Sequence, residues 1–137
     1  MRARTVLSLL LLLSPACLWR SYADVLRVHL DVLGGMADKA MYNAQAGQRP
    51  TSNEVTELTY PLQRARQFAY QYRSYGERES YRLFVSALDR YQALSEAIDA
   101  ARGDAARWEA ERVQIGAQYQ AWRDAADQVR AALAREG

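Results

Sequence analysis

The sequence is poor in the residues that most often cross-link a fold or carry chemistry. Its 137 residues include one cysteine, Cys17, and one histidine, His29. A single cysteine excludes a disulfide framework and a cysteine-based zinc site within the chain. A single histidine excludes a histidine-rich metal site, and it leaves the serines without a base at useful spacing. We therefore expect neither catalysis nor a metal centre.

Residues that break regular structure are also scarce, with seven glycines and three prolines. Half of the residues are hydrophobic and a quarter are charged, which is typical of a globular protein rather than a disordered one. The length suits one domain.

Two basic residues and a short apolar run open the chain. Arg2 and Arg4 precede five consecutive leucines, Leu9 to Leu13. The apolar run is about nine residues long, whereas a helix that crosses a bilayer needs roughly 20. The pattern therefore predicts a secretory signal peptide rather than a membrane-spanning helix.

The only cysteine directly follows this run. Residues 14–17, Ser-Pro-Ala-Cys, resemble a bacterial lipobox, in which the cysteine becomes the lipidated first residue of the mature chain. The motif departs from the usual pattern at Ser14, where leucine is usual, and at Pro15. The resemblance implies that residues 1–16 are a signal peptide, which leaves residues 17–137 for the single domain that the length predicts. In such lipoproteins a non-acidic residue after the cysteine, here Leu18, implies sorting to the outer membrane.

A second cleavage position competes with the first. Ser21 and Ala23 supply the small residues that an ordinary signal peptidase needs, which gives a cut after residue 23 and a soluble periplasmic protein. However, Ser21 and Asp24 also resemble a capping box at the start of the following helix, and this cut would discard it. The sequence therefore favours lipidation at Cys17 and keeps cleavage after Ala23 as the alternative.

The charges nearly cancel once the leader is removed. The whole chain has 18 basic and 16 acidic residues, a net charge of +2. Cleavage after Ala16 removes Arg2 and Arg4 and leaves no net charge, and the later cut also removes Arg20. A near-neutral domain lacks the basic field that nucleic-acid binding requires, so we expect no nucleic-acid partner.

Four segments show the periodicity of an amphipathic helix, at about residues 22–46, 53–75, 77–102 and 104–135. Thr51 and Asp104 are the predicted N-caps of the second and fourth segments, and Gly47 predicts the end of the first. Short turns between such helices favour an all-α fold, an antiparallel up-down-up-down four-helix bundle preceded by the signal segment.

The first two segments contain features that could interrupt them. Gly34 and Gly35 predict either a bend or the close approach of another backbone, and Pro61 should kink its helix or restart it from Thr59. The predicted core stripe of the first segment is Leu26, Leu30, Leu33, Ala37, Met41 and Ala44, widened by Val25, Val28 and Val32.

His29 and Met36 are seven residues apart and share a helix face. Haem iron takes axial ligands of these two types. In architecture and length the plan is similar to exported four-helix haem bundles of the cytochrome b562 and cytochrome c′ type, and that resemblance implies His29 and Met36 as candidate ligands. The chain departs from it because it has no Cys-x-x-Cys-His motif and no histidine in its last helix. We therefore expect no cofactor.

Tyrosines and arginines alternate over residues 60–91. Both residue types are enriched at protein interfaces, because a ring or a guanidinium buries area while keeping a polar group. The simpler interpretation is that these tyrosines pack one end of the bundle and extend their hydroxyls to water. If the stretch is an interaction surface, its expected residues are Tyr70, Tyr72, Arg73, Tyr75, Arg78, Tyr81 and Arg82.

These patterns predict a non-catalytic, exported protein of the bacterial cell envelope. We expect a lipid anchor in the membrane and a structural or protein-interaction role, with another envelope protein as the partner. The alternative is a small-ligand binder that holds haem or an apolar molecule between its helices.

Overall fold

The computed structural model describes residues 15–137, with side chains from Trp19 onward. Four long helices and one short 3-10 turn make up this range, and no strand occurs within it. The elements are α2 (Pro15–Gln45), α3 (Ser52–Gln71), η1 (Arg73–Tyr75), α4 (Glu79–Arg102) and α5 (Ala105–Glu136). The prediction of an all-helical bundle is confirmed for these residues. The predicted signal peptide lies outside them except for its last two positions.

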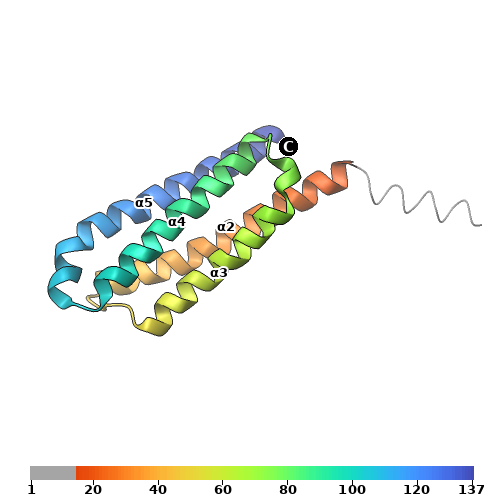
Figure 1. The fold of residues 1–137 in the computed structure, drawn as a ribbon. Helices are drawn as coiled ribbons and strands as arrows, with labels where there is room; N and C mark the ends of the chain where they lie inside the picture. The colour runs from red at the N-terminus through yellow and green to blue at the C-terminus, as the bar shows by residue number, and fades with distance from the viewer. Residues whose placement is uncertain (1–14) are drawn as a thin grey trace, which may run out of the picture.

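The helices lie side by side, and consecutive helices run in opposite directions (Figure 1). Each helix contacts the next one along the chain, and α2 also contacts α5. An ion pair of 3.1 Å between Arg130 and Asp31 links α5 to α2. The start of α2, the turn η1 and the end of α5 therefore meet at one end of the bundle (Figure 1).

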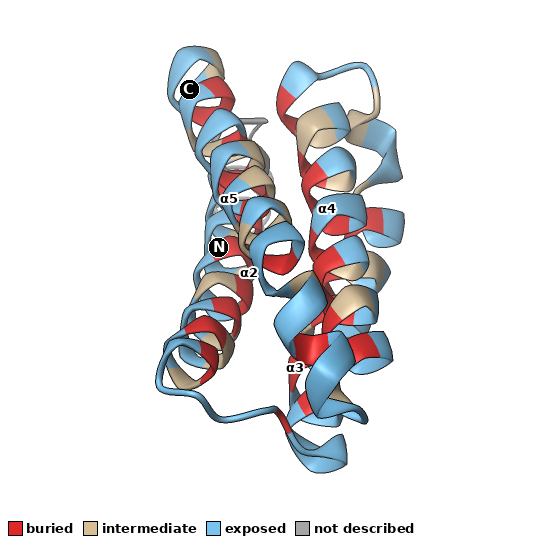
Figure 2. Cartoon of the chain, turned by 90° about the vertical axis from the view of Figure 1, so that its left-hand side faces the viewer, coloured by how far each residue is buried: buried red, intermediate tan, exposed pale blue. Residues whose placement is uncertain are grey.

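One stripe of each helix faces the common core, as the buried residues in Figure 2 show. All six residues of the predicted core stripe in α2 are buried, from Leu26 to Ala44. In α4 and α5 the largest buried side chains are aromatic, namely Phe84, Tyr91 and Trp122. Apolar burial of this kind is the main favourable term that holds helices together.

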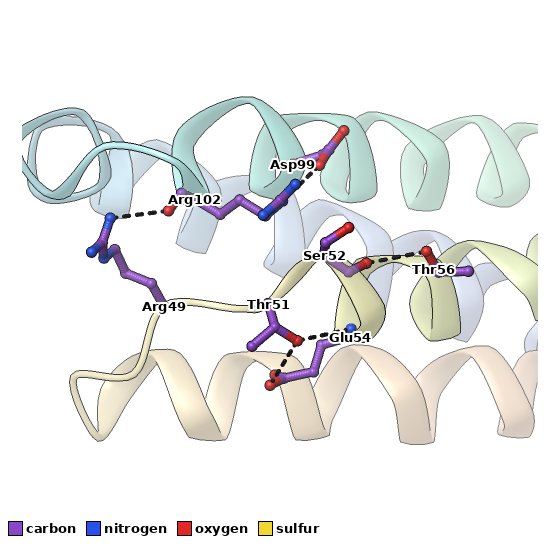
Figure 3. A network of polar contacts seen from close by, with 7 residues as sticks. All are labelled: Arg49, Thr51, Ser52, Glu54, Thr56, Asp99 and Arg102. Carbon is purple, nitrogen blue, oxygen red and sulfur yellow. Dashed lines mark hydrogen bonds and ion pairs between the residues drawn. The ribbon is translucent and has the colours of Figure 1, made fainter.

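Local signals set the helix ends where the sequence predicts them. The backbone N–H of Glu54 donates to Thr51 Oγ1 over 3.2 Å, which caps α3 (Figure 3). The Asp104 carboxylate accepts from the N–H of Ala106 at 2.9 Å and caps α5. Gly47 has a φ of 82°, a left-handed conformation that ends α2 at little cost for glycine.

The linker between α2 and α3 is also held by a side chain. Arg49 donates to the carbonyl of Arg102 at 3.1 Å, so the linker is tied to the end of α4 (Figure 3). Arg102 in turn pairs with Asp99 at 2.9 Å. This end of the bundle is thus fastened by polar contacts on its surface.

Helix α2 begins earlier than the periodicity predicts. Ser21 and Asp24 lie inside α2, so the expected capping box at this position is wrong. Asp24 instead faces Arg27 one turn later, at 3.4 Å. The physical reason is tertiary packing, because Trp19 and Tyr22 find aromatic partners that extend the helix toward the N-terminus.

Two expected interruptions do not interrupt their helices. A Cβ on Gly34 or Gly35 would meet nothing within 4 Å, so close approach of another backbone is wrong. Helix α3 continues through Pro61 and does not restart at Thr59. Burial of Leu58, Leu62 and Ala65 on one stripe carries α3 across the missing hydrogen bond.

Candidate functional site

An aromatic cluster fills the end of the bundle where α2 begins. The ring of Tyr22 is fully buried and stacks on Tyr75 with 4.2 Å between centroids. Trp19 and Tyr72 approach the same ring at 5.4 and 5.6 Å. We call Trp19, Tyr22, Tyr72 and Tyr75 the aromatic cluster. Offset and edge contacts of this kind add to the stability gained from buried area.

A chain of hydrogen bonds runs beneath this cluster. The hydroxyl groups of Tyr22 and Ser80 lie 2.8 Å apart, and Ser80 is itself fully buried. Glu136 accepts from both the N–H and the hydroxyl of Ser80. Burial, the largest cause, raises the pKa of Tyr22. The Ser80 hydrogen bond opposes it and the nearby Glu136 carboxylate adds to it, and the net pKa is about 12.

No motif in the sequence indicates that Ser80 is buried. Its position could have been found from register, because Ser80 stands one turn before the core residue Phe84 on the same stripe of α4. A buried serine needs a partner, and here the partners come from α2 and the end of α5.

The seven expected interaction residues divide into two groups. Tyr72, Tyr75 and Tyr81 are half-buried and pack against the core. The hydroxyl of Tyr81 donates to the carbonyl of Ala69 at 2.7 Å, which fastens α4 to the end of α3. These three tyrosines therefore help to hold the bundle end together.

The remaining four residues, Tyr70, Arg73, Arg78 and Arg82, are exposed. The guanidinium of Arg73 lies 4.1 Å from the ring centroid of Tyr70, and that of Arg78 lies 4.4 Å from Trp19. Arg82 donates to the carbonyl of Glu77. We call these four residues the Tyr/Arg surface. Stacked guanidinium groups keep donors available on the outside of the molecule.

His29 lies two turns after Tyr22 on the same face of α2, where α2 meets α3. Its ring is half-buried against Phe68, with 4.6 Å between centroids. Burial, and then the charge of Arg64, lowers the pKa of His29. The imidazole is therefore neutral at pH 7.

His29 borders an open hollow of about 520 Å³ between α2 and α3. We call it the valine hollow, after Val28 and Val32; its other walls include Tyr60, Arg64 and Phe68. Met36 does not line it and instead borders the neighbouring depression, together with Lys39 and Glu57. The two candidate haem ligands therefore face different parts of this side of the bundle.

The valines of this hollow overturn one expectation. Val28 and Val32 are 58% and 48% exposed, so the prediction that they widen the core stripe is wrong. The reason is the register of α2. Val28 stands two positions from both Leu26 and Leu30, and Val32 two positions from Leu30, so both valines point away from the buried stripe.

Among the side chains described, those of residues 19–137, no group of three or more histidine, cysteine or acidic residues could hold a metal ion. Over residues 15–137 no helix is long and apolar enough to cross a membrane. No protein-family model matches the chain, and searches of curated proteins and of solved structures each found no match.

Proposed function

We propose that this chain is a lipid-anchored protein of the bacterial cell envelope, exported by its leader and held in the outer membrane through Cys17. Its helical bundle, antiparallel and up-down-up-down, serves a non-catalytic structural or protein-interaction role. The basis is the leader, in which two arginines, a short apolar run and the only cysteine occur in that order.

The burial of Tyr22 is the observation that carries the choice of anchor. A cut after Ala23 would remove Tyr22, its stacking on Tyr75 and its hydrogen bond to Ser80. It would also remove Trp19, on which Arg78 stacks. Loss of a buried aromatic residue costs about 3–5 kcal/mol, a large part of a small domain's stability. Cleavage before Cys17 keeps all of these contacts.

The anchor is tested by cell fractionation and by the intact mass of the protein. We expect the protein in the membrane fraction, with a mass that corresponds to cleavage after Ala16 plus attached lipid. Cys17→Ser should release it into the soluble periplasm. Ser21→Ala, an exposed change on the same helix, is the matched control and should leave it in the membrane. An N-terminus at Asp24, or unchanged membrane retention of Cys17→Ser, contradicts the proposal.

The Tyr/Arg surface is the proposed contact with another envelope protein. It is the exposed part of the Tyr/Arg stretch, and arginine and tyrosine side chains that stack in pairs are typical of interface anchors. A photo-crosslinking residue placed at Tyr70 in living cells should capture one dominant partner, which Arg73→Ala should reduce. The same residue placed at Tyr42, which is equally exposed but far along α2, should not capture it. Equal capture at both positions rules out the surface.

A small-ligand binder remains the second candidate, because His29 borders an open hollow. If the ligand is haem, added hemin should give a Soret band that His29→Ala abolishes. Met36→Leu tests whether Met36 is the second axial ligand, because the substitution should shift the band only if the sulfur binds iron. Absence of the band from the folded protein eliminates haem.

A further inference from the structure

The valine hollow concentrates apolar side chains that face water. Within residues 19–137 six large hydrophobic residues are exposed, and three of them, Val28, Val32 and Tyr60, line this one hollow. Isolated exposed apolar residues need no explanation, but a contiguous patch in a concave place is typical of a binding site. The hollow of about 520 Å³ has the size of a site for a small molecule.

Val28 and Val32 are not part of the hydrophobic core. The residues of α2 that hold the bundle together, such as Leu26, Leu30 and Leu33, are fully buried on the opposite side of the helix. On α3 the core is likewise formed by Leu58 and Leu62, and Tyr60 between them points to solvent and is 59% exposed. The hollow is thus an apolar surface that the fold itself leaves uncovered.

The hollow has few polar groups, and only one of them carries a charge that no neighbouring group balances. Arg64 borders the hollow, and no carboxylate of residues 15–137 pairs with it. Asp24, the acidic residue of the same lining, pairs with Arg27. His29 is neutral at pH 7, and the next depression along carries Lys39 and Glu57, whose charges are opposite. Arg64 is therefore the charge that a ligand can balance.

We propose that the valine hollow binds a single-chain anionic amphiphile, such as a fatty acid. Its apolar chain lies against Val28, Val32 and Phe68, and its carboxylate pairs with the guanidinium of Arg64. A purely apolar ligand would make no use of the exposed guanidinium of Arg64, and a charged ligand with no chain would leave the valines in water. The inference gives a chemical class to the second candidate function, and it does not depend on the lipid anchor.

Photoaffinity labelling of the full chain tests this site. The probe is dodecanoic acid carrying a diazirine group, and labelled peptides are located by mass spectrometry. We expect labelling of the α2 and α3 segments that line the hollow, and unlabelled dodecanoic acid should compete for it. Arg64→Gln should reduce the labelling about tenfold, because a charge-assisted contact is lost. Val28→Asp should reduce it at least as much.

Two matched controls and a neutral probe make the result specific. Arg66→Gln removes an arginine of α3 that already pairs with Asp89, and Val113→Asp changes an exposed valine on α5. Both controls should label like the unchanged protein. The corresponding alcohol, dodecanol with the same diazirine, should label weakly and without dependence on Arg64.

Several outcomes overturn the proposal. Labelling that Arg64→Gln leaves unchanged, or equal labelling by acid and alcohol, shows that no anionic group is recognised. Labelling that is absent from the hollow eliminates a small-molecule site there, whatever hemin does. A dimer that Val28→Asp converts to monomer, with no competition by dodecanoic acid, makes the hollow a contact between two copies of the chain.

Discussion

The two halves of the bundle pack differently although both are built from amphipathic helices. Helices α4 and α5 share the most extensive contact, and large rings fill it, with Tyr91 and Trp122 edge to face at 5.2 Å. Helices α2 and α3 meet over smaller core residues and leave valines in water beside an open hollow. The difference indicates that the α4–α5 hairpin contributes more of the stability, while the α2–α3 pair leaves apolar surface uncovered.

The largest expected effect comes from the ring at the centre of the α4–α5 contact. Trp122→Ala should cost about 3–5 kcal/mol of unfolding free energy, because a fully buried indole leaves a cavity. Phe68→Ala, a half-buried ring of the α2–α3 side, should cost clearly less. Urea denaturation of both variants provides the comparison. An equal or larger loss of unfolding free energy for Phe68→Ala would contradict the proposed difference in packing between the two halves.

The next effect concerns Tyr22, which connects α2 to α4 through Ser80. Burial raises its pKa from 10.0 to about 12, so the folded state keeps the phenol proton after an unfolded chain has released it. Stability from this group is therefore complete below pH 10 and is lost as the pH rises through 12, a loss of about 2 kcal/mol.

Tyr22→Phe separates the pH-dependent stability due to Tyr22 from that due to other tyrosines. Burial also raises the pKa of Tyr91, so the unchanged protein loses stability at high pH from both groups. The variant should lose less stability than the unchanged protein between pH 10 and 12, as measured by chemical denaturation at each pH. Parallel curves for the two proteins mean that the Tyr22 hydroxyl is not shielded from water at this end of the bundle.

A smaller effect is expected at the cap of α3. Thr51→Ala removes the acceptor for the Glu54 N–H and should cost about 1 kcal/mol. If α2–α3 is the looser half, hydrogen exchange should accelerate in α3 while the protection of α4 and α5 stays the same. Asp104→Ala, which removes the cap of α5, is the matched change in the other half. Uniform acceleration in Thr51→Ala means that the bundle unfolds as one unit.

The sequence predicts those parts of this fold that depend on neighbouring residues. Thr51 and Asp104 cap their helices because their side chains reach only two or three residues along the chain. The leucine stripe of α2 follows from a period that any helix imposes.

Contacts between distant residues could not be predicted in this way. Ser80 is a core residue because Tyr22 and Glu136 lie beside it, 58 and 56 residues away in sequence. The hollow beside Val28 and Val32 depends on α3, which places Tyr60, Arg64 and Phe68 next to α2. Likewise, the Tyr/Arg stretch gives no indication of which tyrosines pack inward, since that is set by the position of η1 and the start of α2.

The smallest expected effect tests the exposed side of α2. Val28→Thr together with Val32→Thr keeps the β-branched shape and should change the unfolding free energy by less than about 0.5 kcal/mol, because both side chains already contact water. Leu26→Ala, two positions away on the buried stripe, should cost about 2–5 kcal/mol. Thermal and urea denaturation distinguish the two results. A large loss for the double threonine variant means that the valines are covered in solution, and the hollow is then part of the packing that stabilises the bundle.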